Sequence, residues 1–331
     1  MSEFGPPDVL VPAQVADPAA GPGQVLVDVE IANVTFVETQ IRAGRAPHPS
    51  MLPRLPAILG NGVGGVVSSA GAARELAGTR VITTTGGSGG YAERVAVDPA
   101  WLIRVPPEQD LADAVALLAD GRTAVALMRA AAVRAGETVL VEAAAGGVGS
   151  LLVQLARNAG ADVIAAARGQ RKLAVAAALG ALATVDYTEP GWADQVRATS
   201  GGVDVVFDGV GGPTGLTAFG LLRRGGRFCA FGMASGTFAP IAEGAAVTPA
   251  GAGVTVMRGA PVSPGQMSEL TRSALAEAAA GRLRPVIGQT FPLGRAADAH
   301  AAIESRATVG KTLLLAPAYR TGPISVPDSS A

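Results

Sequence analysis

The spacing of hydrophobic and polar residues changes near residue 110. Before that point, apolar residues alternate with polar ones in short runs that are separated by glycine and proline. In the segment 25–31, valine or isoleucine occupies every second position around Asp28 and Glu30, which is typical of a half-buried strand. Similar runs predict strands over 63–69, 80–85 and 91–97. Short strands with frequent turns favour a compact antiparallel barrel or sandwich.

After residue 110, strands and helices alternate. The predicted helices cover 111–134 (with an interruption at Gly121), 149–159, 171–179, 192–199, 214–222 and 264–281. The predicted strands cover 138–143, 162–167, 183–186, 203–208, 226–231 and 253–257. Apolar strands with helices between them indicate a parallel, doubly wound sheet. The segment 285–315 returns to short strands, with a helix over 295–305.

Composition and charge narrow the possible partners. At 331 residues, the chain is long enough for about two domains. The net charge of −1 shows no basic excess, which argues against a nucleic-acid partner. The single cysteine, Cys229, excludes an intramolecular disulfide framework and a cysteine-cluster zinc site, and its predicted buried strand indicates an inert thiol. The most apolar window, 112–133, is interrupted by charged residues and predicts a buried helix, so no membrane partner is expected. The first eight residues lack the features of a signal peptide, so we expect a cytoplasmic protein.

A glycine-rich loop lies between a predicted strand and a predicted helix. Its spacing, Ala144-x-Gly146-x-x-Gly149, matches the dinucleotide-binding fingerprint except that alanine replaces the first glycine. Glycine lets the backbone approach a pyrophosphate and lets the helix pack against the strand, while the amides at the helix start bind the anion. The position of the loop within a strand–helix–strand series supports a nucleotide site. The alternative is an ordinary tight turn.

The next predicted strand ends at Arg168. In NAD-binding sites, an acidic residue at this strand end binds the ribose hydroxyls, whereas an arginine suits a 2′-phosphate. Arg171 and Lys172 follow within the next helical turn. Basic side chains at a helix start oppose the helix dipole, which favours a bound anion as their explanation. The cluster therefore predicts NADPH as cofactor rather than NADH. The alternative is a solvated basic helix start.

Several segments together resemble the zinc-free quinone oxidoreductases of the medium-chain dehydrogenase/reductase superfamily. The resemblance covers about residues 20–316 and rests on the segments 41–44, 143–149 with Gln154, 185–187, 203–212, 292–300 and 310–311. It implies a GroES-like, β-rich catalytic domain over 1–114 and 285–331, and a Rossmann domain over 115–284. The fold class is thus α/β, with the cofactor in the cleft between the domains. The resemblance also implies a homodimer.

The resemblance assigns residues to the cofactor position by position. Arg168, Lys172 and Tyr187 match the positions that hold the 2′-phosphate and adenosine end, and Phe231, Gly232 and Ser235 match the loop beside the nicotinamide. The complete set of expected NADPH-binding residues is Thr123, Ala144, Gly146, Gly147, Val148, Gly149, Arg168, Lys172, Tyr187, Val210, Phe231, Gly232, Ser235 and Lys311.

This chain departs from the zinc-dependent relatives at each ligand position. Those relatives carry Gly-His-Glu at residues 60–62, a cysteine at Thr35 and a third ligand near Asp120. We therefore expect no metal site and catalysis without zinc. The candidate catalytic residues are Thr35, Gln40, Asn61 and His48, of which His48 is also compatible with an exposed loop residue. Tyrosines that some relatives place at Gln40 and Ala46 are absent, which leaves a tyrosine proton donor without support. Tyr91 is expected in the core, and His300, in a predicted helix, is expected to be structural.

Three functions follow from these observations. The first is NADPH-dependent hydride transfer to a small-molecule quinone or another electron-poor enone. The second is reduction of an enoyl group on a biosynthetic, polyketide-type intermediate, which needs an oxyanion stabilised and a carbon protonated. The third is a non-catalytic, NADPH-binding regulatory protein.

Overall fold

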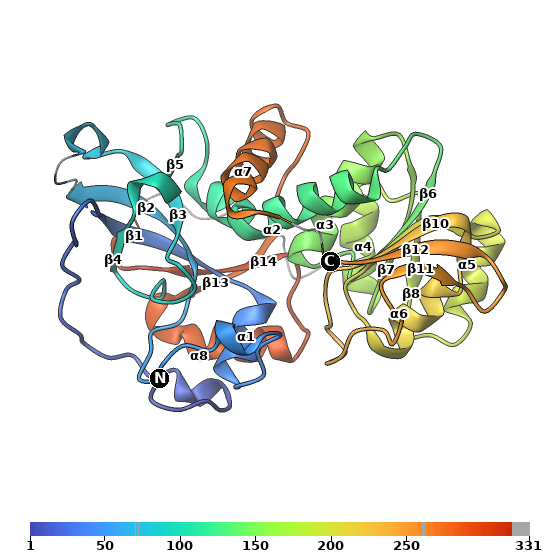
Figure 1. Cartoon of the computed structure of the whole chain (residues 1–331), viewed down its shortest axis with the longest axis horizontal. Helices are drawn as coiled ribbons and strands as arrows, with labels where there is room; N and C mark the ends of the chain where they lie inside the picture. Colours follow the sequence, from blue (N-terminus) through green and yellow to red (C-terminus); the bar gives the residue numbers. More distant parts are fainter. Residues whose placement is uncertain (70, 72, 260–261, 320–331) are drawn as a thin grey trace. The chain divides into compact units, whose positions relative to one another are not determined.

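The computed structural model of the chain describes residues 1–319, apart from residues 70, 72, 260 and 261. Within the described residues, the chain divides into two compact units. Unit 1 consists of residues 1–119 together with the segment that starts at Pro285, and unit 2 consists of residues 120–284. Each unit contains one seven-stranded sheet (Figure 1). The predicted α/β class, with a β-rich unit and a doubly wound unit, is confirmed.

The sheet of unit 1 is mainly antiparallel. Its strand order is β13-β14-β1-β2-β3-β5, and β4 also pairs with β1. The strands are β1 (Val25–Val34), β2 (Gly62–Ser69), β3 (Arg80–Thr84), β4 (Arg94–Val97), β5 (Ile103–Arg104), β13 (Ile287–Pro292) and β14 (Lys311–Leu315). The alternation in β1 is confirmed, because Val25, Val27 and Val29 are completely buried while the residues between them are only partly so. Because β14 pairs with β1, strands from the end of the chain complete this sheet.

Two helices of unit 1 belong to the description of its site. Helix α1 (Phe36–Arg42) follows β1, and helix α8 (Ala296–Glu304) lies against α1, β13 and β14. The alternation pattern did not predict α1, because its residues 38–42 are all buried and show no amphipathic stripe. The helix begins instead with a capping box, in which the Thr35 and Glu38 side chains and backbones bond to each other.

The sheet of unit 2 is parallel except at one edge. Its strand order is β11-β12-β10-β9-β6-β7-β8, and only β11 runs antiparallel to its neighbour. The strands are β6 (Thr138–Glu142), β7 (Asp162–Ala167), β8 (Ala183–Asp186), β9 (Val203–Asp208), β10 (Leu222–Ala230), β11 (Gly244–Val247) and β12 (Gly253–Arg258). From β6 the chain builds first toward β7 and β8, and then returns to add β9 on the other side. The order therefore reverses between β6 and β9, which is where doubly wound sheets bind ligands.

Helices connect the strands of unit 2. They are α3 (Gly147–Asn158), α4 (Gln170–Ala178), α5 (Trp192–Ser200) and α6 (Gly212–Phe219), with α7 (Pro264–Ala279) beside the second half of α2 (Leu111–Ala131) (Figure 1). The predicted interruption of α2 at Gly121 was wrong. Glycine in a helix costs only about 1 kcal/mol relative to alanine, and the buried neighbours Leu117 and Ala124 hold the helix in place. The predictions also placed the starts of α3 and α6 two residues too late and did not include β11.

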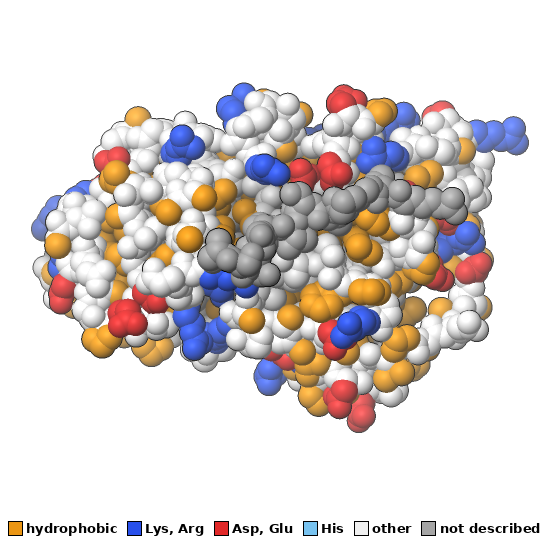
Figure 2. All heavy atoms as spheres, turned by 180° about the vertical axis from the view of Figure 1, so that it is seen from behind, with side chains coloured by type: hydrophobic (Ala, Val, Ile, Leu, Met, Phe, Trp, Pro, Cys, Tyr) orange, Lys and Arg blue, Asp and Glu red, His pale blue; other side chains and the backbone are white. Residues whose placement is uncertain are grey.

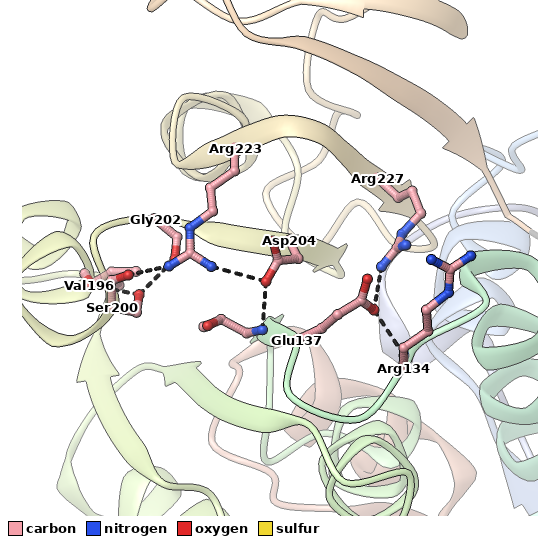
Figure 3. A network of polar contacts seen from close by, with 9 residues as sticks. Arg134, Glu137, Val196, Ser200, Gly202, Asp204, Arg223 and Arg227 are labelled. Carbon is pink, nitrogen blue, oxygen red and sulfur yellow. Dashed lines mark hydrogen bonds and ion pairs between the residues drawn. The ribbon is translucent and has the colours of Figure 1, made fainter.

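Ion pairs join the strands of unit 2 at their amino ends (Figure 3). Asp204, in β9, accepts hydrogen bonds from the Thr138 amide of β6 at 2.8 Å and from the Arg223 guanidinium of β10 at 3.0 Å. Beside it, Glu137 pairs with Arg227 of β10 at 2.6 Å. Asp204 thus links β9 to both of its neighbouring strands, and Glu137 links the start of β6 to β10, at the edge opposite the glycine loop.

The mixture of surface charges on the described residues agrees with the near-neutral net charge of the sequence. Figure 2 shows the molecule from behind the view of Figure 1. On this face, acidic and basic side chains are interspersed among many apolar ones. Among the described residues, no helix combines the length and hydropathy needed to cross a bilayer. Cys229 lies completely buried in β10, and burial raises the pKa of its thiol to about 12, as expected for an inert cysteine.

One buried ion pair holds α1 to α8 in unit 1. Arg42 is only 2% exposed, and its guanidinium makes two hydrogen bonds to Glu304, at 2.6 and 3.3 Å. Because water cannot solvate Arg42, the Glu304 carboxylate is its main source of compensation.

We predict that Glu304→Ala lowers the free energy of unfolding of the protein by about 3 kcal/mol, because it leaves a buried charge without its partner. The matched control is Asp298→Ala, in the same helix, since the Arg295–Asp298 pair is 64% and 47% exposed. That change should cost less than about 1 kcal/mol. Urea melts of both variants provide the measurement, and equal losses would contradict the assignment.

Candidate active site

The glycine loop of unit 2 is a tight turn without room for side chains. A Cβ atom at Gly149 would lie 2.2 Å from the Ala143 carbonyl oxygen, and one at Gly147 would lie 2.0 Å from the Asp120 carboxylate. Ala143 itself has a positive φ of 49°, which is unusual for a residue other than glycine. Gly146 forms the N-cap of α3 and therefore contributes only backbone at the helix start. The geometry suits close approach of an anion to the backbone amides.

A second loop meets the first at the reversal point of the sheet. After β9, the Asp208 carboxylate accepts hydrogen bonds from the amides of Val210 at 3.0 Å and Gly211 at 2.6 Å. The loop after β10 then bonds to this turn: the Phe231 amide donates to the Asp208 carbonyl at 2.8 Å, and the Ser235 amide donates to the Val210 carbonyl at 2.8 Å. Three of the predicted cofactor residues, Val210, Phe231 and Ser235, are thus brought together by main-chain contacts, and Gly232 adjoins them.

Arg168 is exposed at the carboxyl end of β7. Its neighbour Gly169 has a positive φ of 82° and donates its amide to Asp186 at 2.7 Å. Hydrogen bonds from Thr188 and Gly169, together with the charge of Arg168, hold the pKa of Asp186 below its ordinary value, against the effect of burial. Lys172 and Tyr187 are half-buried on α4 and after β8. A cation therefore stands at the position where the sequence predicts a 2′-phosphate.

The site of unit 1 is organised around one buried carboxylate. Glu38 accepts four hydrogen bonds: from the Thr35 amide at 2.6 Å, the Thr35 hydroxyl at 3.0 Å, the Asn61 amide at 2.9 Å and the Tyr91 hydroxyl at 3.2 Å. Burial raises the pKa of Glu38, while the hydrogen bonds from Thr35 and Asn61 and the charge of Lys311 act in the opposite direction. Two candidate catalytic residues and one predicted cofactor residue are therefore coupled to the same carboxyl group.

Behind Glu38, Tyr91 connects to His300 of α8. The Tyr91 oxygen lies 2.9 Å from His300 Nε2, and the two rings meet edge to face with centroids 5.7 Å apart. His300 Nδ1 is buried and has no hydrogen-bond partner. An unpaired buried N–H is costly, so the tautomer with the proton on Nε2 is favoured. His300 then donates to Tyr91, and Tyr91 donates to Glu38. Burial and the charge of Arg42 lower the pKa of His300 to about 3, so the ring is neutral.

The structure places the other candidate catalytic residues, Asn61, Gln40 and His48, in different surroundings. Asn61 accepts a hydrogen bond from the Gly87 amide at 2.7 Å, which ties it to the glycine-rich turn before Tyr91. Gln40 is buried in α1 and donates to the Thr39 hydroxyl at 3.0 Å. His48 is exposed, and its ring nitrogen lies 2.7 Å from the Ser50 hydroxyl. The hydrogen bonds of the described residues thus join Thr35 and Asn61 to Glu38, whereas those of His48 remain within its own loop.

Sequence reasoning assigned Tyr91 to the core and His300 to a structural role, and in unit 1 Tyr91 is half-buried while His300 is completely buried. Their connection to Glu38 was not predicted, because residues 38, 91 and 300 are remote in the chain and only the sheet brings them together. A capping-box pattern at Thr35 and Glu38 was the one local signal available. Across the described residues, no group of three His, Cys, Asp or Glu side chains is arranged to hold a metal ion.

Two family models match the two parts of the chain. The model for the alcohol dehydrogenase GroES-like domain matches residues 21–107, and the model described as zinc-binding dehydrogenase matches residues 179–314. The second description names a metal, but residues 35 and 60–62 of this chain, at the positions where we expect zinc ligands in such enzymes, are Thr35 and Gly60-Asn61-Gly62.

Full-length relatives extend the similarity to nearly the whole chain. A 2-haloacrylate reductase from a Burkholderia species is 33% identical over 324 residues, covering 94% of this chain and 96% of that protein. A quinone oxidoreductase from Pseudomonas aeruginosa is 31% identical, with 94% and 97% covered. The crystal structure of Escherichia coli quinone oxidoreductase complexed with NADPH superposes with a TM-score of 0.83, at 27% identity and with 95% and 98% covered.

We predict that Gly149→Ala lowers the free energy of unfolding by about 2 kcal/mol, because the new methyl group must displace the Ala143 carbonyl. Gly265→Ala is the matched control, since Gly265 also lies in a helix but a Cβ there would meet no atom within 4 Å. That control should gain about 0.5–1 kcal/mol from helix propensity. Denaturant melts measure both changes, and a neutral Gly149→Ala would show that the loop is not under this constraint.

Proposed function

Because the chain belongs to the zinc-free quinone oxidoreductase family of the medium-chain dehydrogenase/reductase superfamily, we propose that it binds NADPH and reduces a quinone or another electron-poor enone. It is an oxidoreductase, as are the relatives that match it over nearly their full length. The E. coli relative was crystallised with NADPH. The observation that carries the cofactor assignment is the exposed Arg168 at the end of β7, one strand away from the glycine loop.

The residues of unit 2 fit a dinucleotide phosphate. The amides at the start of α3 and the Cβ-free turn at Gly146 and Gly149 would hold the pyrophosphate. Arg168 would pair with the 2′-phosphate, because a guanidinium binds phosphate oxygens in two places at once. The loops at Val210 and Phe231 would form the wall beside the nicotinamide. A bound NADPH would supply the hydride.

The hydrogen bonds of unit 1 favour an acceptor that needs little acid catalysis. The Thr35 hydroxyl donates a hydrogen bond to Glu38, so its hydrogen is already engaged when an acceptor binds. The Tyr91 hydroxyl is likewise committed to Glu38, and the tautomer of His300 directs its proton to Tyr91. A reduced quinone can take its protons from water. We therefore infer that Thr35 and Asn61 position the acceptor, while solvent supplies the protons.

A second candidate function is reduction of an activated carbon–carbon double bond. The 33% identity to a 2-haloacrylate reductase favours it, since that name denotes an electron-poor alkene as substrate. An enoyl intermediate in biosynthesis belongs to the same chemical class. Catalysis by either route is proposed to proceed without zinc. The expectations of a homodimer and of a cytoplasmic location stay predictions.

The test is NADPH oxidation, followed at its absorbance band, with a panel of quinones, enones, 2-haloacrylate and a CoA-linked enoyl substrate. We expect turnover with quinones or simple enones, and unchanged turnover after dialysis against a strong chelator. Loss of activity that zinc restores would contradict the metal-free mechanism. Turnover only with the CoA-linked substrate would favour the enoyl reductase. Tight NADPH binding without turnover of any acceptor would favour a regulatory protein.

We further predict that Arg168→Ala raises the KM for NADPH roughly 10- to 100-fold, because a charge-assisted hydrogen bond contributes about 1.5–3 kcal/mol. The KM for NADH should stay the same. Arg197→Ala is the control, since Arg197 is exposed on α5 and pairs with Asp194 in the same helix. Steady-state kinetics with both cofactors provides the measurement. An equal rise for NADH and NADPH would indicate a structural role for Arg168.

A further inference from the structure

A pair of buried carboxyl groups lies at the reversal point of the unit 2 sheet. Glu142 is the last residue of β6 and Asp208 is the last residue of β9, and both are completely buried. The two strands are parallel neighbours, with Val141 opposite Phe207. Glu142 and Asp208 therefore occupy the next opposing positions, and their side chains leave the sheet on the same face.

Three of the four carboxyl oxygens in this pair have no hydrogen-bond donor. Asp208 Oδ1 accepts the amides of Val210 and Gly211, but Asp208 Oδ2 and both Glu142 oxygens have no such partner by geometry. Helix α6 closes the space beside Oδ2, because a Cβ at Gly215 would lie 2.5 Å from that oxygen. Two full negative charges buried side by side, with donors to only one of their four oxygens, would be strongly unfavourable.

A single proton between the two groups removes this conflict. A neutral Glu142 can donate its hydroxyl hydrogen to Asp208 Oδ2, which supplies a partner to both residues and leaves one negative charge. Asp208 is the better acceptor of the two, because two backbone amides already donate to its Oδ1. Burial, together with the hydrogen bond to Asp208 and its charge, raises the pKa of Glu142 well above its ordinary value. The turn after β9 and helix α6 present backbone to Asp208, at Gly211 and Gly215.

The pair also lies directly under the two turns of the candidate cofactor site. Ala143 follows Glu142 and opens the glycine loop, while Gly209 follows Asp208 and opens the second loop. The two turns touch, since a Cβ at Gly209 would lie 3.2 Å from the Ala143 side chain. A hydrogen bond between the two carboxyl groups therefore connects the strand ends from which both turns start.

We propose that Glu142 and Asp208 share one proton, donated by Glu142, and that this bond is a positioning element for the two turns that hold the cofactor. The positioning role rests on the proposed NADPH site, whereas the shared proton does not. A single charge in place of two also reduces the repulsion that a bound pyrophosphate would meet.

Difference infrared spectroscopy of the full-length protein tests the shared proton directly. At neutral pH, a protonated carboxyl group gives a carbonyl band that is separate from the carboxylate bands and shifts in D2O. We expect this band in the wild type and in Glu189→Gln, an exposed control, and its loss in Glu142→Gln. No protonated carboxyl band in the wild type at neutral pH would overturn the proposal.

The pH dependence of stability supplies a second readout. Above the ordinary Glu pKa of 4.5, the unfolded chain loses the proton that folded Glu142 keeps, so this residue makes stability fall as pH rises toward its raised pKa. Glu142→Gln retains an N–H donor for Asp208 and does not titrate. Relative to the wild type, its melting temperature should therefore rise between pH 5 and pH 8, whereas Glu189→Gln should run parallel to the wild type. A parallel curve for Glu142→Gln would contradict the proposal.

Cofactor titration tests the positioning role. Glu142→Leu removes the donor and leaves Asp208 Oδ2 unpaired, so NADPH should bind about tenfold more weakly, whereas Glu142→Gln should bind within about twofold of the wild type. Equal affinity of Glu142→Leu and the wild type would overturn the positioning role. If the wild type itself does not bind NADPH, the proposed function fails, while the infrared result still decides the shared proton.

Discussion

The close approach of Gly149 to the Ala143 carbonyl is the constraint on which unit 2 depends. The 2.2 Å between that oxygen and a hypothetical Cβ leaves α3 only one way to start, with backbone amides at the end of β6. Because the sheet reverses its order between β6 and β9, the turn after β9 reaches the same point. The turns at this edge of unit 2 are therefore built largely from main chain, with Arg168 exposed at the end of the neighbouring strand β7.

Unit 1 depends on a different constraint, which is that the buried carboxyl group of Glu38 needs hydrogen-bond donors. Glu38 is only 3% exposed, and four donors from three segments surround its two oxygens. Each donor is itself fixed by something else: Thr35 by the start of α1, Asn61 by its bond to Gly87, and Tyr91 by His300. The chain of hydrogen bonds ends at the unpaired Nδ1 of His300, away from solvent. The network therefore holds Tyr91 and Glu38 in a fixed orientation.

This orientation has a chemical consequence. In unit 1, the hydroxyl hydrogens closest to Glu38 point toward that carboxylate, so they are already in use before any acceptor binds. For the function proposed above, this favours an acceptor that is stable after hydride addition and takes its protons from water over one that needs an internal acid. The same principle of satisfying buried polar groups explains Asp208 and Glu142 in unit 2, where the shortage of donors is met by a proton.

The pattern of residues alone determined the β-rich first part, the alternating strands and helices, and the glycine loop, because periodicity and turn chemistry are local properties. The position of Arg168 at the end of a strand also followed from the order and length of the predicted elements. Local patterns did not predict α1, because its buried residues show no amphipathic pattern. At Gly121 they wrongly predicted a break in the helix, because packing outweighs the low helix propensity of glycine. The coupling of Glu38, Tyr91 and His300, and the pairing of Glu142 with Asp208, were decided only by tertiary structure. A hydrogen bond between distant residues depends on strand register and helix placement, which no single segment encodes.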